Sequence, residues 1–171
     1  MTTLITLLQS FTAQVVMLLE QLPAATRDAA RLSVVLQTTD GLQTVQVQIE
    51  GAIVTVTEND APAHIRLTAP FAVLANLMQH GSMRFVTEPI INGKLRNLYQ
   101  LHGALRLLLT DGDAVLVRFN DATQPEAVIK ISQADAIGLL SGTLNPQVAF
   151  MTGRLQIVSG MSFLMSLERI M

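Results

Sequence analysis

The chain has 171 residues, of which 50% are hydrophobic and 14% are charged, with a formal net charge of −2 and no Cys. This length suits one domain with a substantial core, and the charged share lies well below the usual figure of about 25%. The composition excludes a disulfide framework, a thiolate nucleophile and a Cys-ligated metal site, and it argues against nucleic-acid binding, which needs a concentrated basic face.

The N-terminal segment carries an apolar seam. Its members alternate spacings of four and three: Leu4, Leu8, Phe11, Val15, Leu18 and Leu22. This pattern predicts an amphipathic helix over residues 1–22 that packs either on the chain's own domain or on a second copy, which would form a homodimer. A helix lying on a membrane surface is the other alternative, but no Lys or Arg precedes Arg27 to meet anionic lipid.

Targeting signals are also missing from the sequence. The N-terminus lacks the basic start of a secretory signal, and its recurring Thr, Gln and Ser argue against a membrane span. The last four residues, 168–171, do not resemble the Ser-Lys-Leu peroxisomal address. We therefore expect a cytoplasmic protein without stable membrane insertion, whose main domain covers residues 23–171.

Residues 31–81 predict strands followed by a helix. Val45, Val47 and Ile49 alternate with polar residues, as in a strand with one wet face. RLSVVLQT before this strand and AIVTVT after it complete an antiparallel meander, with turns at Asp40-Gly41 and Glu50-Gly51. HIRL predicts a fourth strand, after which Thr68 would cap a helix that has Pro70 in its first turn and ends at Gly81.

Two segments share one order of elements. AIVTVTENDAPAHIRLT and AVLVRFNDATQPEAVIKIS each read as strand, acidic turn, Pro, strand and hydroxyl cap. This indicates a degenerate internal repeat, with halves at 31–90 and 91–171, whether by duplication or by a shared supersecondary pattern. The linking run NGKLRNLYQLHGALRLLL reads mainly as a helix, with a turn into a strand before Asp111, so Lys94, Arg96 and Arg106 are expected as solvated helix charges.

Helix caps divide the C-terminal segment into short elements. Ser132 is placed to cap a helix that ends at Gly142, with Asp135 able to reach back in a capping box. Asn145 would cap a second helix that has Pro146 at its first position and ends at Gly153. RLQIV then reads as a strand, and Gly160 opens a last helix. The expected fold class is α+β, a mixed or antiparallel sheet covered by helices.

The sequence shows no catalytic constellation. His64, His80 and His102 have no metal-ligand spacing, and no Ser lies in a G-x-S-x-G elbow. Asp111-Gly112-Asp113 has the composition of a tight turn. We therefore expect a non-enzymatic protein without metal or cofactor.

The run ISQADAIGLLSGTLNPQVAFMTGRLQI carries a family signature. It resembles the C-terminal half of the sterol carrier protein type 2 (sterol-binding) family, chiefly in Asn145-Pro146-Gln147 followed by Ala149-Phe150 and a Gly-basic-Leu strand. A looser match covers residues 31–81, while Ser159-Gly160 shifts the family's turn by a residue. The resemblance implies an α+β domain in which helices over a mixed sheet enclose a hydrophobic tunnel for lipid.

Apolar residues on the covering helices are the candidates for lining this tunnel, and four of them are Met, whose flexible thioethers suit varied apolar shapes. The predicted ligand-binding residues are Phe71, Leu74, Met78, Ile137, Leu140, Phe150, Met151, Met161, Phe163, Leu164 and Met165. The expected ligand is a lipid or other apolar small molecule: a fatty acyl chain, sterol, phospholipid or quinone. The alternative is an interaction or dimerisation module with a filled pocket, which assists a lipid- or quinone-handling enzyme.

Overall fold

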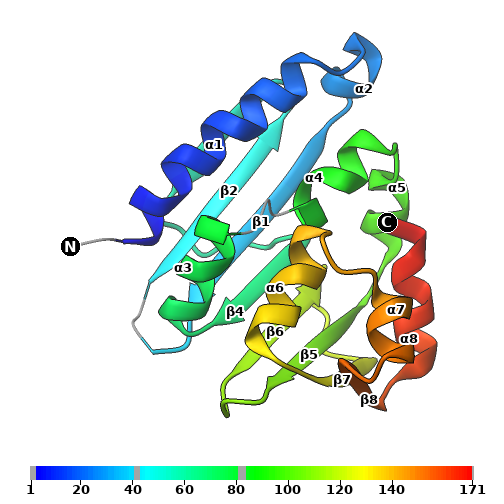
Figure 1. The fold of residues 1–171 in the computed structure, drawn as a ribbon. Coiled ribbons are helices and arrows are strands. Elements are labelled where there is room, and N and C mark those ends of the chain that lie inside the picture. The colour runs from blue at the N-terminus through cyan, green and yellow to red at the C-terminus, as the bar shows by residue number, and fades with distance from the viewer. Residues whose placement is uncertain (1–2, 41–42, 81–83, 171) are drawn as a thin grey trace.

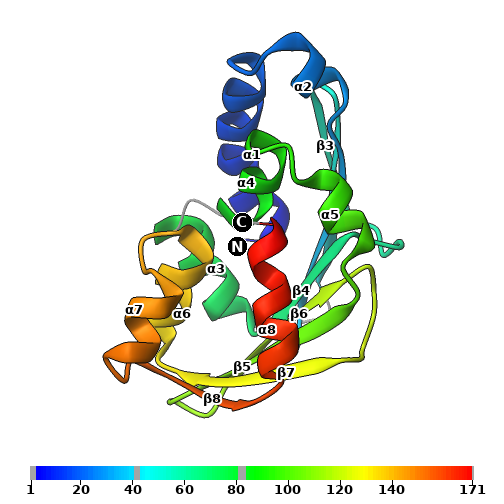
Figure 2. The same ribbon diagram turned by 90° about the vertical axis from the view of Figure 1, so that its right-hand side faces the viewer.

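A computed structural model describes residues 3–40, 43–80 and 84–170, so the predicted glycines 41 and 81 lie outside the described residues. Its strands form one eight-stranded sheet in the order β3-β2-β1-β4-β6-β5-β7-β8. Helices α1, α3, α6 and α8 lie over one face of this sheet (Figures 1 and 2). The parallel pairs β1–β4 and β5–β7 stand among antiparallel ones, which confirms the α+β class with a mixed sheet.

The first half of the sheet begins with the predicted meander. Strands β1 (Arg31–Thr38), β2 (Thr44–Glu50) and β3 (Ile53–Thr57) pair antiparallel in chain order, and β4 (Ile65–Ala69) returns beside β1. The alternation in β2 holds except at Gln46, which is buried although we expected it on the wet face. Its side chain donates to Ser33 Oγ at 2.9 Å and accepts from Asn59 Nδ2 at 3.0 Å, and these bonds satisfy the buried amide.

Helix α1 (Leu4–Glu20) uses the apolar seam within its own chain, against β2, β3 and α3. The buried residues are Leu4, Leu8, Phe11, Val15 and Leu19, so the prediction of Leu18 was wrong by one position. A straight helix has 3.6 residues per turn, and a strict heptad pattern drifts across its surface by about 20° every seven residues. The buried stripe therefore moves to Leu19 in the last turn, and Leu22 is only partly buried.

Two short helices connect the halves, and one cap differs from its prediction. After α2 (Ala24–Asp28) and the meander, α3 spans Phe71–His80, followed by α4 (Arg84–Ile91) and α5 (Leu95–Gln100). Thr68 does not cap α3, because it belongs to β4 and pairs with Gln37 of β1. The Asp40 carboxylate supplies the cap instead and accepts from the Phe71 backbone N–H at 3.1 Å.

The second half contains β5 (Gly103–Leu109), β6 (Ala114–Phe119), β7 (Glu126–Ile131) and β8 (Leu155–Ser159). The run before Asp111 was expected to be mainly a helix that turns into a strand; the helix is limited to α5, and the strand begins earlier than expected, at Gly103. Leu-rich residues 103–109 form a strand because β6 and β7 pair with them on both sides. Arg106 is therefore a strand residue and not a solvated helix charge, and its Nε lies 3.1 Å from Glu126 Oε1. The Asp113 N–H binds Asp111 Oδ1 at 3.1 Å, which confirms the tight turn.

The strand order shows an internal repeat. In the first half the order is β2-β1-β4 and in the second it is β6-β5-β7, each with a hairpin, a parallel third strand and then a helix. The counterpart of β6 is thus β2, whereas the two sequence segments had matched β6 with β3. The two units meet where β4 pairs antiparallel with β6.

Candidate functional site

The candidate site lies on the helix-covered face of β5, β7 and β8. Register pairs Leu107 with Ile129 and Ile129 with Ile157, and it pairs Leu105 with Ala127, so these side chains share one sheet face. Ala127 and Leu107 are fully buried, whereas Leu105 and Ile157 are half-buried against the core. This face is therefore an apolar floor that its helices cover incompletely.

Helix α8 (Met161–Ser166) sits on this floor through two glycines. Gly160, at φ 83°, precedes the helix, and a Cβ there would lie 2.4 Å from Ala127 Cα. A Cβ on Gly103 would lie 2.3 Å from the Phe163 ring. Phe163 also packs on Phe119, with ring centroids 6.2 Å apart. The glycines thus allow a contact that any larger residue would prevent.

Helices α6 (Gln133–Ser141) and α7 (Pro146–Met151) are held by the predicted caps. Ser132 Oγ accepts from the Asp135 N–H at 3.1 Å, and Asn145 Oδ1 accepts from the Gln147 N–H at 2.9 Å. The Asp135 side chain does not complete a capping box but bonds to Arg154, at 3.3 Å from its Nε. The Arg154 hydrogen bond lowers the pKa of Asp135, so this carboxylate stays ionised while it ties the start of β8 to α6.

The structure distributes the predicted ligand-binding residues over three environments. Phe71, Leu74 and Met78 lie on α3, which packs beside α6. The buried members are Leu74 and Phe163, and the half-buried ones are Phe71, Met78, Ile137, Leu140 and Leu164. Four others are exposed to solvent: Phe150, Met151, Met161 and Met165. The structure therefore brings α3 and α6 members together, but it leaves those of α7 at the surface.

A C-terminal apolar surface emerges from these exposed residues. It consists of Val148, Phe150, Met151, Val158, Met161 and Met165, on α7, β8 and α8. These elements lie at the same end of the molecule, away from α2 (Figures 1 and 2). The prediction did not include Val148 and Val158, or Leu105 and Ile157. An apolar residue in a strand or a short helix is typical of the protein core, so the sequence did not distinguish these four. The sequence signal that could have indicated this surface is the scarcity of charge, because residues 136–167 contain one charged side chain, Arg154.

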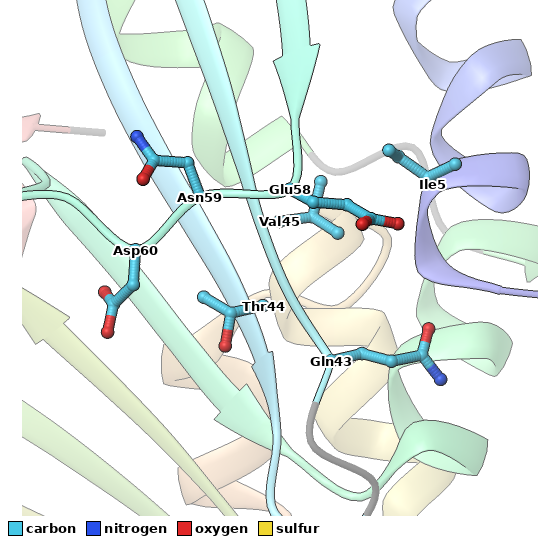
Figure 3. Close-up of a pocket in the computed structure, with 7 residues that line it drawn as sticks. All are labelled: Ile5, Gln43, Thr44, Val45, Glu58, Asn59 and Asp60. Atoms are coloured by element: carbon cyan, nitrogen blue, oxygen red, sulfur yellow. The ribbon is translucent and has the colours of Figure 1, made fainter.

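Two open cavities lie elsewhere, beside α1. One has a volume of about 260 Å³, between Ile5 of α1, the start of β2 and the segment after β3 (Figure 3). Its lining residues are Ile5, Gln43, Thr44, Val45, Glu58, Asn59 and Asp60. The other, of about 300 Å³, lies between α1 and edge strand β3 and is lined by Ile5, Gln9, Thr12, Val54 and Val56. None of the predicted ligand-binding residues lines either cavity.

Arg66 forms ion pairs with two carboxylates, one of which, Asp60, lines the first cavity. Arg66 Nη1 lies 2.7 Å from Asp60 Oδ1, and Arg66 Nε lies 2.7 Å from Asp121 Oδ1. Burial opposes ionisation of Asp121, but hydrogen bonds from Arg66 and the Ala63 amide outweigh it and lower the pKa of this carboxyl. These contacts join the two halves, and they indicate a structural role.

The two histidines whose side chains the structure describes, His64 and His102, lack catalytic geometry. His64 Nδ1 accepts from the Ser33 N–H at 2.9 Å, and burial lowers its pKa. His102 is exposed between α5 and β5, not within a helix as expected. Among the described residues, no group of three or more His, Asp or Glu could hold a metal ion. In the same part of the chain, no helix is long and apolar enough to cross a membrane.

The comparisons with known proteins identify the family. The model of the SCP-2 sterol transfer family matches residues 83–171, about half of the chain. The chain belongs to this family. The match contains β5 to β8 and α6 to α8, but not residues 31–81, where the sequence had suggested a looser likeness.

The comparison of solved structures gave a distant relative. The chain is similar to a sterol carrier protein 2-like 2 from Aedes aegypti at 8% identity and a TM-score of 0.32, with 99% of this chain and 100% of that one covered. Comparison with curated proteins gave no match. The candidate site thus lies within the SCP-2 segment, whereas both cavities beside α1 lie outside it.

Proposed function

We propose that the chain binds a lipid or another apolar small molecule without catalysing a reaction on it. Membership of the SCP-2 sterol transfer family supports this proposal, because that family name describes lipid handling. The structural support is the incompletely covered apolar floor in the matching segment. There, half-buried side chains come from α6, α8 and two strands: Ile137, Leu140, Leu164, Leu105 and Ile157.

Binding at this floor would draw on the hydrophobic effect. Each methylene that leaves water contributes about 0.8 kcal/mol, so an acyl chain of modest length gains enough to bind without any ionic contact. Fatty acyl chains, sterols, phospholipids and quinones all satisfy this chemistry. Of the predicted ligand-binding residues, we propose Ile137, Leu140 and Leu164 as the main contacts, because they are half-buried; helix α3, which carries three others, packs beside α6. The proposed location of the protein is the cytoplasm.

The first experiment is native mass spectrometry of the purified protein, followed by organic extraction and lipid identification. We expect a discrete bound mass that disappears on extraction, and uptake of an added fluorescent fatty acid by extracted protein. Leu140→Trp and Leu164→Trp should each lower this uptake at least tenfold, because the indole occupies the floor. Met17→Trp, at an exposed site on α1, is the matched control and should leave it unchanged.

A clean mass without uptake would favour the alternative function, an interaction module with a filled pocket. The burial of Leu74 and Phe163 on this face supports that alternative. The homodimer suggested by the N-terminal seam would have to use the outer side of α1, around Met17, because Leu4, Leu8 and Phe11 are buried in the chain's own core. The oligomer mass in the same spectrum tests this.

A further inference from the structure

The outer face of the sheet, opposite α1, α3, α6 and α8, differs between the two halves of the molecule (Figures 1 and 2). In the first half, register joins Ser33 to Gln48 and Gln48 to Thr55 on this face. Most other positions there are also polar, and Val35 and Ile53 are the apolar exceptions. A polar outer face is typical of a sheet that packs on one side and meets water on the other.

The outer face of the second half carries an apolar patch instead. Leu116 pairs with Arg106 and Arg106 pairs with Val128, so these side chains form one row across β6, β5 and β7. Leu108 lies two residues from Arg106 on β5 and is the diagonal neighbour of Leu116 and Val128. The Arg106 guanidinium is bonded to Glu126, which compensates its charge. We name Leu108, Leu116 and Val128 the outer patch, and all three are half-buried.

Two cations border the outer patch. Arg118 lies beside it on β6, and Lys130, which is exposed, lies beside it on β7. Within the described part of the chain neither forms an ion pair, and Arg118 Nε is a buried donor without a hydrogen-bond partner. The charge of Asp121 interacts with Arg118, but its oxygens are already bonded to Arg66 and the Ala63 amide. A buried donor without an acceptor is unfavourable, so an incoming carboxylate oxygen would stabilise this site.

We propose that the outer patch docks an amphipathic helix of a partner protein that carries an acidic residue at each end of its apolar stripe. Register sets Arg118 level with Glu126, so Lys130 lies two strands across and four residues along from Arg118. With strands about 4.8 Å apart and a rise of about 3.3 Å per residue, this span is about 16 Å. A helix rises about 1.5 Å per residue, so the span corresponds to about 11 residues. The partner helix therefore has Asp or Glu at i and i+11, on one face, with apolar residues at i+4 and i+7.

Other partners fit the outer patch less well. A second copy would add unpaired cations of its own, while the Glu126 carboxylate that it brings to this face is already bonded to Arg106. A bilayer is disfavoured because the patch side chains are half-buried among charged neighbours, and because anionic lipid attracts clusters of four or more cations. A carboxylate on a helix supplies one acceptor at a fixed place, as the Arg118 donor requires.

The inference goes beyond the proposed function and does not depend on it. The apolar floor faces the helices, whereas the outer patch lies on the opposite face of the same strands. Lipid and partner helix can therefore bind at the same time. Fatty acid uptake reports on the floor alone, and contacts at Lys130 report on the outer patch alone.

The test is carbodiimide coupling, which joins a Lys amine to a carboxylate in direct contact with it. The full chain is treated in an extract of cells that naturally express it, and coupled peptides are sequenced by mass spectrometry. We expect Lys130 to be coupled to an Asp or Glu of another protein, in a segment with a second acidic residue 11 positions away. Arg118→Gln leaves Lys130 in place and should lower the yield at least tenfold. The matched control is Arg31→Gln, an exposed cation on the outer face of β1, which should leave the yield unchanged.

A synthetic peptide of the coupled segment then tests the apolar contacts. Leu116→Thr/Val128→Thr keeps β-branched residues in the strands and should weaken binding of the peptide at least tenfold. Ile53→Thr, an exposed apolar residue on the outer face of the first half, is the control and should bind like the wild type. Any of three results would overturn the proposal: no coupling at Lys130, coupling to a second copy or to a segment without the acidic spacing, or equal coupling in Arg118→Gln.

Discussion

The two halves of the sheet share a strand order but differ in how their helices cover it. In the first half, one long helix, α1, buries five apolar residues between its first and last turns. In the second half, α7 and α8 have six residues each, and α7 buries only Ala149. The same topology therefore supports a long, deeply buried helix seam in one half and an apolar face with half-buried side chains in the other. Under the proposed function, the first half contributes mainly to stability and the second half binds the ligand.

The strongest way to test the contrast is to remove part of the buried seam of α1. Leu8→Ala removes a fully buried side chain of α1 and should lower the free energy of unfolding by about 3 kcal/mol, from lost burial plus a cavity. Met17→Ala, on the exposed side of the same helix, is the control and should change it by less than about 0.5 kcal/mol. Urea denaturation measures both. Equal losses would show that α1 does not pack on the sheet through Leu8 as described.

A second variant disturbs the seat of α8 in the other half. Gly160→Ala combines a left-handed backbone with a methyl group 2.4 Å from Ala127 Cα, and we expect a loss of about 2–3 kcal/mol from strain and overpacking. Gly153→Ala has a similar φ of 77° but open space around the new Cβ. It should cost about 1 kcal/mol, so thermal unfolding of the pair isolates the clash. Identical melting shifts would mean that α8 is loosely seated.

A smaller effect should separate two carboxylates, Asp121, which pairs with a buried arginine, and Asp135, which pairs with an exposed one. Asp121→Asn weakens the support of Arg66, which is 6% exposed, and should cost about 1–3 kcal/mol at neutral pH. Because the pKa of Asp121 is lowered on folding, its contribution is present above its unfolded pKa and is lost as pH falls through the lower folded value.

The control for this variant is Asp135→Asn, whose partner Arg154 is exposed. It should leave neutral-pH stability nearly unchanged, because solvent screens such pairs. Denaturation between neutral and acid pH measures both variants. The Asp121 variant should show a flatter acid dependence than the wild type, and an unchanged dependence would contradict the assigned ion pair.

The smallest expected effect is at the C-terminal apolar surface. Met151 is 82% exposed, so Met151→Ser should change the free energy of unfolding by less than about 0.5 kcal/mol while it increases solubility in concentrated solution. Static light scattering together with urea denaturation measures this. A destabilisation comparable to that of Leu8→Ala would place Met151 in the core and contradict its exposure.

Local chemistry made much of the fold predictable. The caps at Ser132, Asn145 and Gly142 depend on a few neighbouring residues, and the structure contains all three. The helix predicted before Asp111 was too long, because whether the Leu-rich residues 103–109 form a strand depends on partners that pair on both sides. Their partners, β6 and β7, come later in the chain, so no local signal announces the pairing.

The candidate site was harder to predict because exposure depends on packing. Phe150 and Phe163 are alike in the sequence, but Phe163 fits the space that Gly103 leaves, whereas Phe150 lies on the outer side of α7. The predicted ligand-binding residues remain a prediction. The scarcity of charge in residues 136–167 is readable from the sequence, but which of its apolar residues reach solvent is not.

The ladder between β4 and β6 has a consequence for synthesis of the chain. Ile65 pairs with Phe119, about 50 residues later, so β4 emerges from the ribosome well before its partner exists. At a synthesis rate of about 5–20 residues per second, its edge waits for about 3–10 s. During that interval β4 can pair with β1 on one side only, and its other side is an open edge of the kind that aggregates or recruits a chaperone. The joint that makes one sheet of two halves is thus also a vulnerable edge of the nascent protein.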